Sequence, residues 1–307
     1  MAVRVVTDSA CDLPPAVCEQ LGIEVVPLTI RFGDKEYVDR KELTTEAFWQ
    51  QLEAASVLPE TAAPSVGAFE EAFRALHADG ADGIVCVNLS AHLSATMQSA
   101  QVAAKALDGL CPIEVIDSES ASMGIGNLTL HAARRAAEGA DVETIASEVV
   151  DRRSRQKLFA TLDTLEYLKK GGRIGGARAL VGSMLSIKPI IAVVDGAVEE
   201  AGKVRTRSKA LQFIIDRIPV GKVESICVLH SAAADLDHFL ELVQPKVPDA
   251  EMIVGRIGPV VGVHVGPGAL GQPRRGDERR RALVERDDGV LVGERQPVAV
   301  PRDDAAQ

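Results

Sequence analysis

Short apolar runs alternate with amphipathic stretches along the first half of the chain, and this alternation restricts the fold most strongly. Residues 3–7, 84–89 and 112–116 are apolar runs of strand length. Each is followed by a loop and then by apolar residues at helical spacing. Parallel strands need such crossover helices because the chain must return to the same end of the sheet. The first half is therefore predicted to be an α/β domain built on a parallel sheet.

The second half has a less regular order. Segments of strand length at residues 187–194 and 197–204 flank Asp195-Gly196, a pair that favours a tight hairpin turn and antiparallel pairing. Further helical and strand-like patterns follow at residues 211–215, 225–229, 235–243 and 251–256. We expect an α+β domain with a mixed sheet.

A chain of 307 residues favours two domains, at roughly 150 residues for each. We place them at residues 1–153 and 154–271, with the boundary in a polar, Arg-rich stretch. Residues 272–307 differ in composition, because Arg, Asp and Glu dominate and the apolar runs are very short. Such a segment buries too little apolar surface to offset its loss of conformational entropy, so we expect an atypical, largely disordered tail.

Composition excludes several functional classes. Lys plus Arg total 34 and Asp plus Glu total 44, a formal charge of −10, and aromatic residues make up 3%. So acidic and aromatic-poor a chain is a weak candidate for binding phosphate backbones or stacking bases, and no nucleic acid is expected as a partner. The five cysteines form no CxxC pair and indicate neither a zinc site nor a disulfide framework. No apolar run approaches the ~20 residues of a membrane-spanning helix, so we expect a cytoplasmic protein.

Two loops rich in Ser and Thr precede predicted helices, at residues 61–65 and 90–96. A helix N-terminus offers free N–H groups and the positive end of the helix dipole. Hydroxyls beside it favour an anion, most naturally a carboxylate or a phosphate. The alternative for Ser94 is a plain N-cap. Asp12 is also predicted to cap the helix that follows it.

A histidine with glycines on both sides is the second candidate. His264 lies between Gly262 and Gly266 and is predicted at a strand end, where it can donate to an anion or act as a base. The alternative is a histidine satisfied within the core. The histidines at positions 77, 92, 131 and 238 have no partner in the sequence pattern and are predicted at the surface.

Residues 169–176 form a basic, glycine-rich stretch. It resembles a phosphate-binding loop, but it lacks the GxxxxGK[ST] order and follows a predicted helix instead of a strand. We interpret it as a surface turn that docks an anionic group or a partner. With Arg205 and Arg207 it is expected to form a local positive patch on an acidic protein.

Eight segments occur together in an order that resembles the DegV family, which includes the bacterial fatty-acid-binding proteins called FakB. They are TDSACDLP at residues 7–14, TAAPS at 61–65, LSAT at 93–96, IDS at 116–118, LKKGGRI at 168–174, KPI at 188–190, KVRT at 203–206 and HVGPGALG at 264–271. No one of them is decisive, but the ordered set covers residues 3–271 and is specific.

The resemblance implies a two-domain DegV-like fold with a ligand site between the domains. Family members bind one long-chain fatty acid and present its carboxyl group to a separate ATP-dependent fatty acid kinase, which makes an acyl phosphate for phospholipid synthesis. By position, Thr61, Ser94, Ala95 and His264 would bind the carboxylate. Arg173 and Arg205 would engage the kinase or handle phosphate. The family also implies a non-catalytic lipid carrier with no cofactor and no metal, and it allows transient membrane contact.

The sequence departs from the family at three places. Ala62 stands where Ser is frequent, and Ala95 stands where Gly is usual, which restricts the approach of its backbone N–H to a carboxylate. After Gly271 the family usually continues with an apolar closing strand. Here residues 272–275 read Gln-Pro-Arg-Arg, so we expect that strand to be lost or replaced, leaving an open sheet edge.

Two other functions remain open at this point. Ser94 with His264 as its base would make an esterase or another serine hydrolase, although no GxSxG elbow surrounds this serine. The third possibility is a sensor of another small carboxylate or phosphate ligand. A short polar pocket would favour the sensor, and a long apolar one the lipid carrier.

Overall fold

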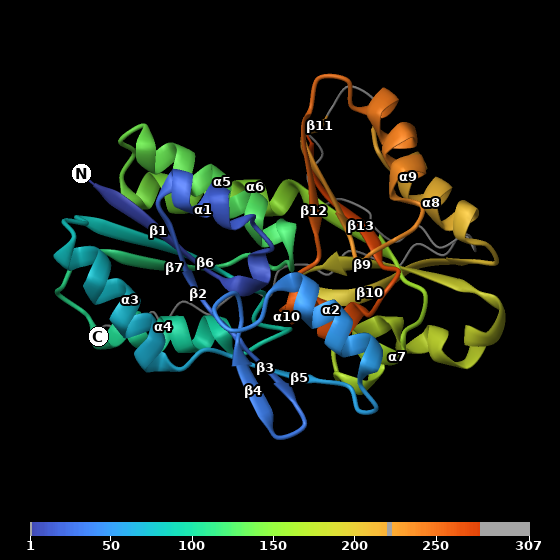
Figure 1. The fold of residues 1–307 in the computed structure, drawn as a ribbon. Helices are drawn as coiled ribbons and strands as arrows, with labels where there is room; N and C mark the ends of the chain where they lie inside the picture. Colours follow the sequence, from blue (N-terminus) through green and yellow to red (C-terminus); the bar gives the residue numbers. More distant parts are fainter. Residues whose placement is uncertain (1, 220–222, 277–307) are drawn as a thin grey trace, which may run out of the picture.

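The computed structural model describes residues 2–219 and 223–276, with the side chains of residues 181–186, 275 and 276 left aside. The described chain contains a four-stranded, a six-stranded and a three-stranded sheet. Figure 1 shows the parallel sheet with α3–α6 on one side of the molecule and the six-stranded sheet with α8 and α9 on the other. The two-domain α/β prediction is confirmed.

The first sheet has the order β2-β1-β6-β7, and all its neighbouring strands are parallel. Its strands are β1 (Val3–Asp8), β2 (Ile23–Val26), β6 (Gly83–Asn88) and β7 (Ile113–Asp117). Side chains alternate between the two faces of a strand. Ile84 and Cys86 therefore pack among side chains of α3 and α4, while Val85 and Val87 pack in the cluster that holds α5 and α6. Helices on both faces explain why β6 is buried throughout.

Helices connect or follow the strands of this domain. They are α1 (Pro15–Leu21), α2 (Thr45–Ala54), α3 (Val66–Ala78), α4 (Thr96–Ala106), α5 (Met123–Ala137) and α6 (Val142–Arg155), with a short 3₁₀ turn η1 (Ser9–Cys11) before α1. Thr44 and Ser65 cap α2 and α3 through backbone N–H groups three residues on. The predicted cap Asp12 is wrong, because the N-cap of α1 is Pro14. Asp12 is instead buried and bonded elsewhere.

An antiparallel three-stranded sheet adds to the first domain. It has the order β4-β3-β5, from β3 (Thr29–Phe32), β4 (Lys35–Val38) and β5 (Glu60–Ala62). This sheet was not predicted from the sequence. The chain leaves the parallel sheet after Val26, and the N–H of Leu28 donates to Ser9 Oγ at 3.0 Å instead of to a strand.

The second sheet has the order β10-β9-β8-β13-β11-β12, with only the β11–β12 pair parallel among its described ladders. Its strands are β8 (Gln156–Thr161), β9 (Lys188–Val194), β10 (Ala197–Val204), β11 (Val223–His230), β12 (Glu251–Arg256) and β13 (Leu270–Gly276). The predicted β9–β10 hairpin is confirmed, because Asp195 and Gly196 have φ values of 47° and 80°, as its tight turn requires.

Helices cover one face of this sheet, and the other face turns toward the first domain. The segments between its strands are α7 (Glu166–Lys170), η2 (Gly175–Ser186), α8 (Arg207–Asp216), α9 (Leu236–Val243), η3 (Gln244–Lys246) and α10 (Pro259–Val265). Phe159 of β8 packs among α8 and α9, including Phe239. Its neighbours Leu158 and Ala160 point to the opposite face, where they line an apolar cavity.

A closing strand is present, contrary to the prediction that residue 272 begins a disordered tail. Strand β13 lies near the middle of the second sheet, antiparallel to β8 and to β11. The polar composition was misleading, because Gln272 and Arg274 are buried here in spite of their polarity. Tertiary pairing on both sides of the strand overrides its low β propensity. Residues 277–307 of the predicted tail lie outside the described residues.

Helix α10 belongs to the second half of the chain but packs against the first domain. The indole N–H of Trp49 in α2 donates to the carbonyl of Ile257 at 3.1 Å. Gly262 of α10 lies so close to α2 that an added Cβ would be 2.5 Å from Phe48 Cε1. This contact, near the centre of Figure 1, makes α10 part of both domains.

Candidate functional site

An apolar cavity lies between the two domains. Its empty volume is about 890 Å³, counting its open mouth. One wall is the inner face of the second sheet, where β8, β9 and β13 contribute the lining residues Leu158, Ala160, Ile191, Val193, Gly271 and Pro273. Helix α10 supplies Val260, Val261 and Val265, and loops of the first domain supply Leu28, Leu89 and Leu93. The wall of the cavity is therefore largely aliphatic, which fits a chain with few aromatic residues.

Polar side chains gather at one part of this cavity. Thr61 of β5, Ser94 before α4, Arg173 after α7 and His264 of α10 all line it. Contacts connect them: Thr61 Oγ1 lies 3.0 Å from His264 Nε2, and Arg173 Nε donates at 3.0 Å to the carbonyl of Leu93, the neighbour of Ser94. The fold thus brings together four of the six residues named from the sequence.

His264 is a neutral imidazole at neutral pH. Burial, and then the positive charge of Arg173, lower the pKa of His264 to about 4. The residue lies in the last turn of α10, not at a strand end as predicted, and the chain turns at Gly266 with φ 70°. An added Cβ at Gly171 would be 2.3 Å from His264 Nδ1, so the ring fits only because residue 171 is glycine.

The surroundings of the His264 ring distinguish its two nitrogen atoms. Nε2 shares a hydrogen bond with Thr61, while Nδ1 is buried without a hydrogen-bond partner among the described residues. If the neutral ring carries its proton on Nε2, it donates to Thr61 Oγ1. The threonine hydroxyl can then donate its own proton to an anion. This arrangement suits recognition of an anion better than general base catalysis.

Ser94 is held by its own helix start. Its Oγ lies 2.9 Å from Thr96 Oγ1 and accepts the N–H of Thr96 at 3.3 Å. Ala95 is the N-cap of α4, is exposed and makes no side-chain cap. Since the Ser94 hydroxyl bonds to Thr96 and the imidazole bonds to Thr61, these residues do not form the serine–imidazole hydrogen bond of a hydrolase.

The three predicted arginines have different surroundings. Arg173 is half-buried, lines the cavity and also donates through Nη1 to the carbonyl of Gly171 at 2.6 Å. Arg205 follows β10, is exposed and is not among the lining residues of the described cavity. Arg207 pairs with Asp235 at 2.8 Å. The predicted positive patch is therefore reduced, because its third arginine is neutralised by a carboxylate.

Two polar residues of the cavity wall, Ser122 and Gln272, were not predicted as site residues. Ser122 lines the cavity and is 5% exposed. The available signal was a run of three alternating serines, Ser118, Ser120 and Ser122, directly after β7. Loops at the carboxyl ends of parallel strands are the usual place for ligands in such sheets, and this loop belongs to them.

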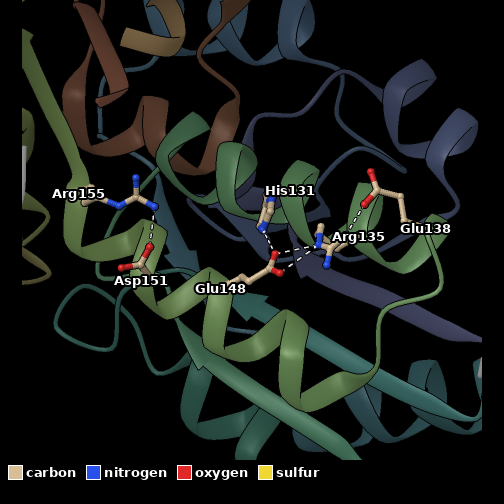
Figure 2. Close-up of polar contacts among 6 residues, drawn as sticks. All are labelled: His131, Arg135, Glu138, Glu148, Asp151 and Arg155. Atoms are coloured by element: carbon tan, nitrogen blue, oxygen red, sulfur yellow. Dashed lines mark hydrogen bonds and ion pairs between the residues drawn. The ribbon is translucent and has the colours of Figure 1, made fainter. Parts of the chain in front are cut away.

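A second polar cluster lies away from the cavity, between α5 and α6 (Figure 2). His131 was predicted at the surface, but it is 9% exposed and its Nε2 lies 2.7 Å from Glu148. Glu148 also accepts from Arg135 Nε at 2.9 Å. The contacts among His131, Glu148, Arg135 and Glu138 join α5 to α6, and a separate ion pair between Arg155 and Asp151 lies within α6.

No helix within residues 2–219 and 223–276 is long and apolar enough to cross a membrane. In the same part of the chain, no group of three or more His, Cys, Asp or Glu side chains is placed to hold a metal ion.

Fold and site together define a class: a two-domain α/β protein that encloses an apolar cavity ending in hydroxyls, an imidazole and a guanidinium. The model of one known protein family matches nearly the whole chain. The family model described as "Uncharacterised protein, DegV family" matches residues 2–272, and the chain belongs to the DegV family.

Relatives and solved structures agree with this assignment. A DegV domain-containing protein of Streptomyces coelicolor is 38% identical over 275 residues, covering 88% of this chain and 96% of the relative. The structure described as fatty acid binding of a DegV family protein from Thermus thermophilus has a TM-score of 0.83 and 31% identity, and covers 90% of this chain and all of that one. DegV from Bacillus subtilis, described as a fatty acid binding protein, has a TM-score of 0.81 and 28% identity over 90% and 99% of the two chains.

Proposed function

We propose that this protein binds one long-chain fatty acid, with the carboxylate at Thr61, Ser94 and His264 and the tail along the aliphatic wall. The observation that carries the proposal is the cavity itself, which combines an apolar wall with a cluster of neutral donors and one cation. The family members from Thermus thermophilus and Bacillus subtilis are described as fatty acid binding, and they share this fold.

Burial of the tail would supply most of the affinity. About 14 methylene groups at ~0.8 kcal/mol each give roughly 11 kcal/mol of gross stabilisation. Lost translational and rotational freedom cancels part of this. Each polar contact to the carboxylate adds about 1.5–3 kcal/mol before desolvation costs. The polar cluster therefore determines where the head group sits, and the sheet face determines how strongly the ligand is retained.

Each residue around the head group has a separate role in binding the carboxylate. Thr61 donates a hydroxyl proton while the neutral His264 holds its oxygen. Ser94 and the backbone N–H of Ala95 lie at the start of α4, where the helix dipole favours negative charge. Arg173 adds a positive charge on the same side of the cavity. A shorter, more polar ligand would leave the aliphatic wall exposed to water, so the small-ligand sensor is disfavoured.

The proposed partner is a separate ATP-dependent fatty acid kinase. In that reaction a carboxylate oxygen attacks the γ-phosphorus of ATP, and an acyl phosphate and ADP are formed for phospholipid synthesis. This protein would hold and present the carboxylate as a non-catalytic, cytoplasmic carrier without a cofactor, and it would load by transient membrane contact. Exposed Arg205 would engage the kinase, and Arg173 would help to position the phosphate.

Native mass spectrometry followed by lipid extraction tests the binding proposal. One fatty acid per chain is expected. A folded protein that carries none and takes up none would contradict the proposal. For the kinase, Arg205→Ala should bind fatty acid as the wild type does but support slower acyl phosphate formation. Loss of fatty acid binding in this variant would refute the role of Arg205 as a docking residue.

A further inference from the structure

Asp12 occupies an unusual position behind the cavity wall. It follows η1 with φ 54° and ψ 19°, a left-handed conformation, and it is 7% exposed. Its Oδ1 accepts the backbone N–H of Gly258 at 3.0 Å, and its Oδ2 accepts the hydroxyl of Ser122. A single buried carboxylate therefore joins the β1 loop to two segments that are 110 and 246 residues away in sequence.

Ser122 is strained where it meets the cavity. Its φ of 54° and ψ of −141° belong to a region of backbone space that is essentially confined to glycine. Ser122 starts α5, yet its side chain makes no capping hydrogen bond there, because its hydroxyl is directed to Asp12. Since Ser122 also lines the cavity, the bond to Asp12 holds a strained piece of the wall in place.

Gly258 is the second segment that Asp12 holds. It is the N-cap of α10, and a Cβ at this position would be 2.6 Å from Asp12 Oδ1. The carboxylate thus fills the space that any other residue would need. The same short helix carries cavity-lining valines and His264, which bonds to Thr61.

We propose that Asp12 is a positioning residue for the ligand cavity. It fixes the strained Ser122 and the start of α10, so that the polar cluster and the aliphatic wall keep the spacing that retains a ligand. Asp12 is not among the lining residues in the described part of the cavity, so it acts through these two segments. The ligand used in the test is the fatty acid, so this step rests on the proposed function.

The ionisation of Asp12 provides a means to test this role. Burial raises the pKa of Asp12 to about 7, against the opposing effects of Ser122, Arg40 and Gly258. Other titratable or charged groups near it are Asp39, whose pKa burial raises to about 6, and Asp8, together with the Cys11 thiol. The guanidinium of Arg40 lies among them and donates to the carbonyl of Ser9 at 3.2 Å.

The ionised carboxylate should hold the wall more firmly than the neutral acid. Hydrogen bonds to an ionised acceptor are the stronger ones, and Asp12 accepts two. Release of bound fatty acid is therefore expected to slow as pH rises through about 7. Stability should change in the opposite direction. The folded pKa of Asp12 lies above its unfolded value of about 3.9, so its stabilising contribution is lost as pH rises from about 4 through about 7.

The experiment measures the rate of release of a fluorescent long-chain fatty acid to acceptor vesicles between pH 6 and pH 8.5. Wild type should release it several-fold more slowly at the upper limit. Asp12→Asn keeps the acceptor for Gly258 but cannot ionise, so its rate should stay near the fast, low-pH value throughout. Asp39→Asn is the matched control, because Asp39 is a buried neighbouring carboxyl to which neither Ser122 nor Gly258 donates its bond. It should keep the pH step, moved to a lower pH because the charge of Asp39 raises the pKa of Asp12. His264 titrates below this range.

A purely structural role would move ligand retention and thermal stability in the same direction with pH. An unchanged pH step in Asp12→Asn would overturn the proposal, and so would release at pH 8.5 as slow as in wild type. Hydrogen exchange of the ligand-free protein at pH 8 gives an independent readout. Amides of α10 and the start of α5 should exchange several-fold faster in Asp12→Asn, whereas equal exchange would refute the positioning role. If wild type binds no fatty acid, the proposed function fails, and this exchange measurement still tests Asp12.

Discussion

Removal of the Thr61 hydroxyl is the most direct test of how the carboxylate head group is recognised. Thr61 Oγ1 is 3.0 Å from His264 Nε2, and the ring is neutral because burial and Arg173 lower the pKa of His264 to about 4. Thr61→Val keeps the shape of the side chain and removes its hydroxyl. It deletes one donor to the carboxylate and leaves Nε2 without its partner in the cavity.

The expected loss follows from these contacts. A hydrogen bond to a charged group contributes about 1.5–3 kcal/mol, and each 1.4 kcal/mol changes a dissociation constant tenfold. Thr61→Val should therefore bind a long-chain fatty acid roughly 10–150-fold more weakly. The apolar wall is unchanged, so a fatty alcohol of the same length should lose little affinity. The ratio of acid to alcohol affinity is thus the quantity that reports on the hydroxyl.

Competition of acid and alcohol against a fluorescent fatty acid at pH 7.5 measures this ratio. Thr29→Val is the matched control, because Thr29 lies on the neighbouring strand β3 opposite Ala62 and does not line the described cavity. It should bind both ligands as the wild type does. If Thr61→Val binds the acid as tightly as wild type, or loses acid and alcohol equally, the carboxylate does not lie at Thr61.

Three further predictions concern the cavity and the sheet behind it. The pKa of His264 is about 4 in the fold, below its usual value, so its stabilising contribution should be lost as pH falls from about 6.5 toward 4. The loss should reach roughly 3 kcal/mol, and urea titrations should not show it in His264→Asn. Ala160→Leu adds bulk to the apolar wall, so binding assays should show a much larger loss for long acids than for short ones. Gln272 is fully buried and neither of its amide atoms has a hydrogen-bond partner among the described residues. Gln272→Leu should raise stability by about 1–3 kcal/mol, and an unchanged or lowered melting temperature would contradict this.

Sequence patterns predicted those elements of the fold that depend on residues close together in the chain. The alternation of apolar runs and helices indicated the parallel sheet because its central strands, β1 and β6, are buried almost throughout. Asp195-Gly196 indicated the β9–β10 hairpin because few other pairs adopt two positive φ angles. Strand β13 could not be predicted this way. Its backbone bonds come from β8 and β11, and its own residues carry no strand signal.

The residues of the site were likewise predicted where they have a local sequence signal and missed where their role depends on distant contacts. Thr61, Ser94 and Arg173 were found because hydroxyls at helix starts and basic glycine-rich turns have local signatures, joined by the family resemblance. Arg205 shares a family motif but lies outside the described cavity lining. Ser122 was missed because its importance depends on a carboxylate 110 residues away. Asp12 was misinterpreted as a helix cap for the same reason, since only the folded chain brings Gly258 to it.

The cavity belongs to neither domain alone, and this has an energetic consequence. Its apolar wall is the inner face of the second sheet, while Thr61 and Ser94 come from the first domain. Helix α10 joins the two, through His264 to Thr61 and through the preceding backbone to Trp49. A ligand that contacts both sides binds only when the domains are docked, so it stabilises the docked state by mass action. Ligand retention and domain docking are therefore one coupled equilibrium, in which residues that hold α10 influence binding without touching the ligand.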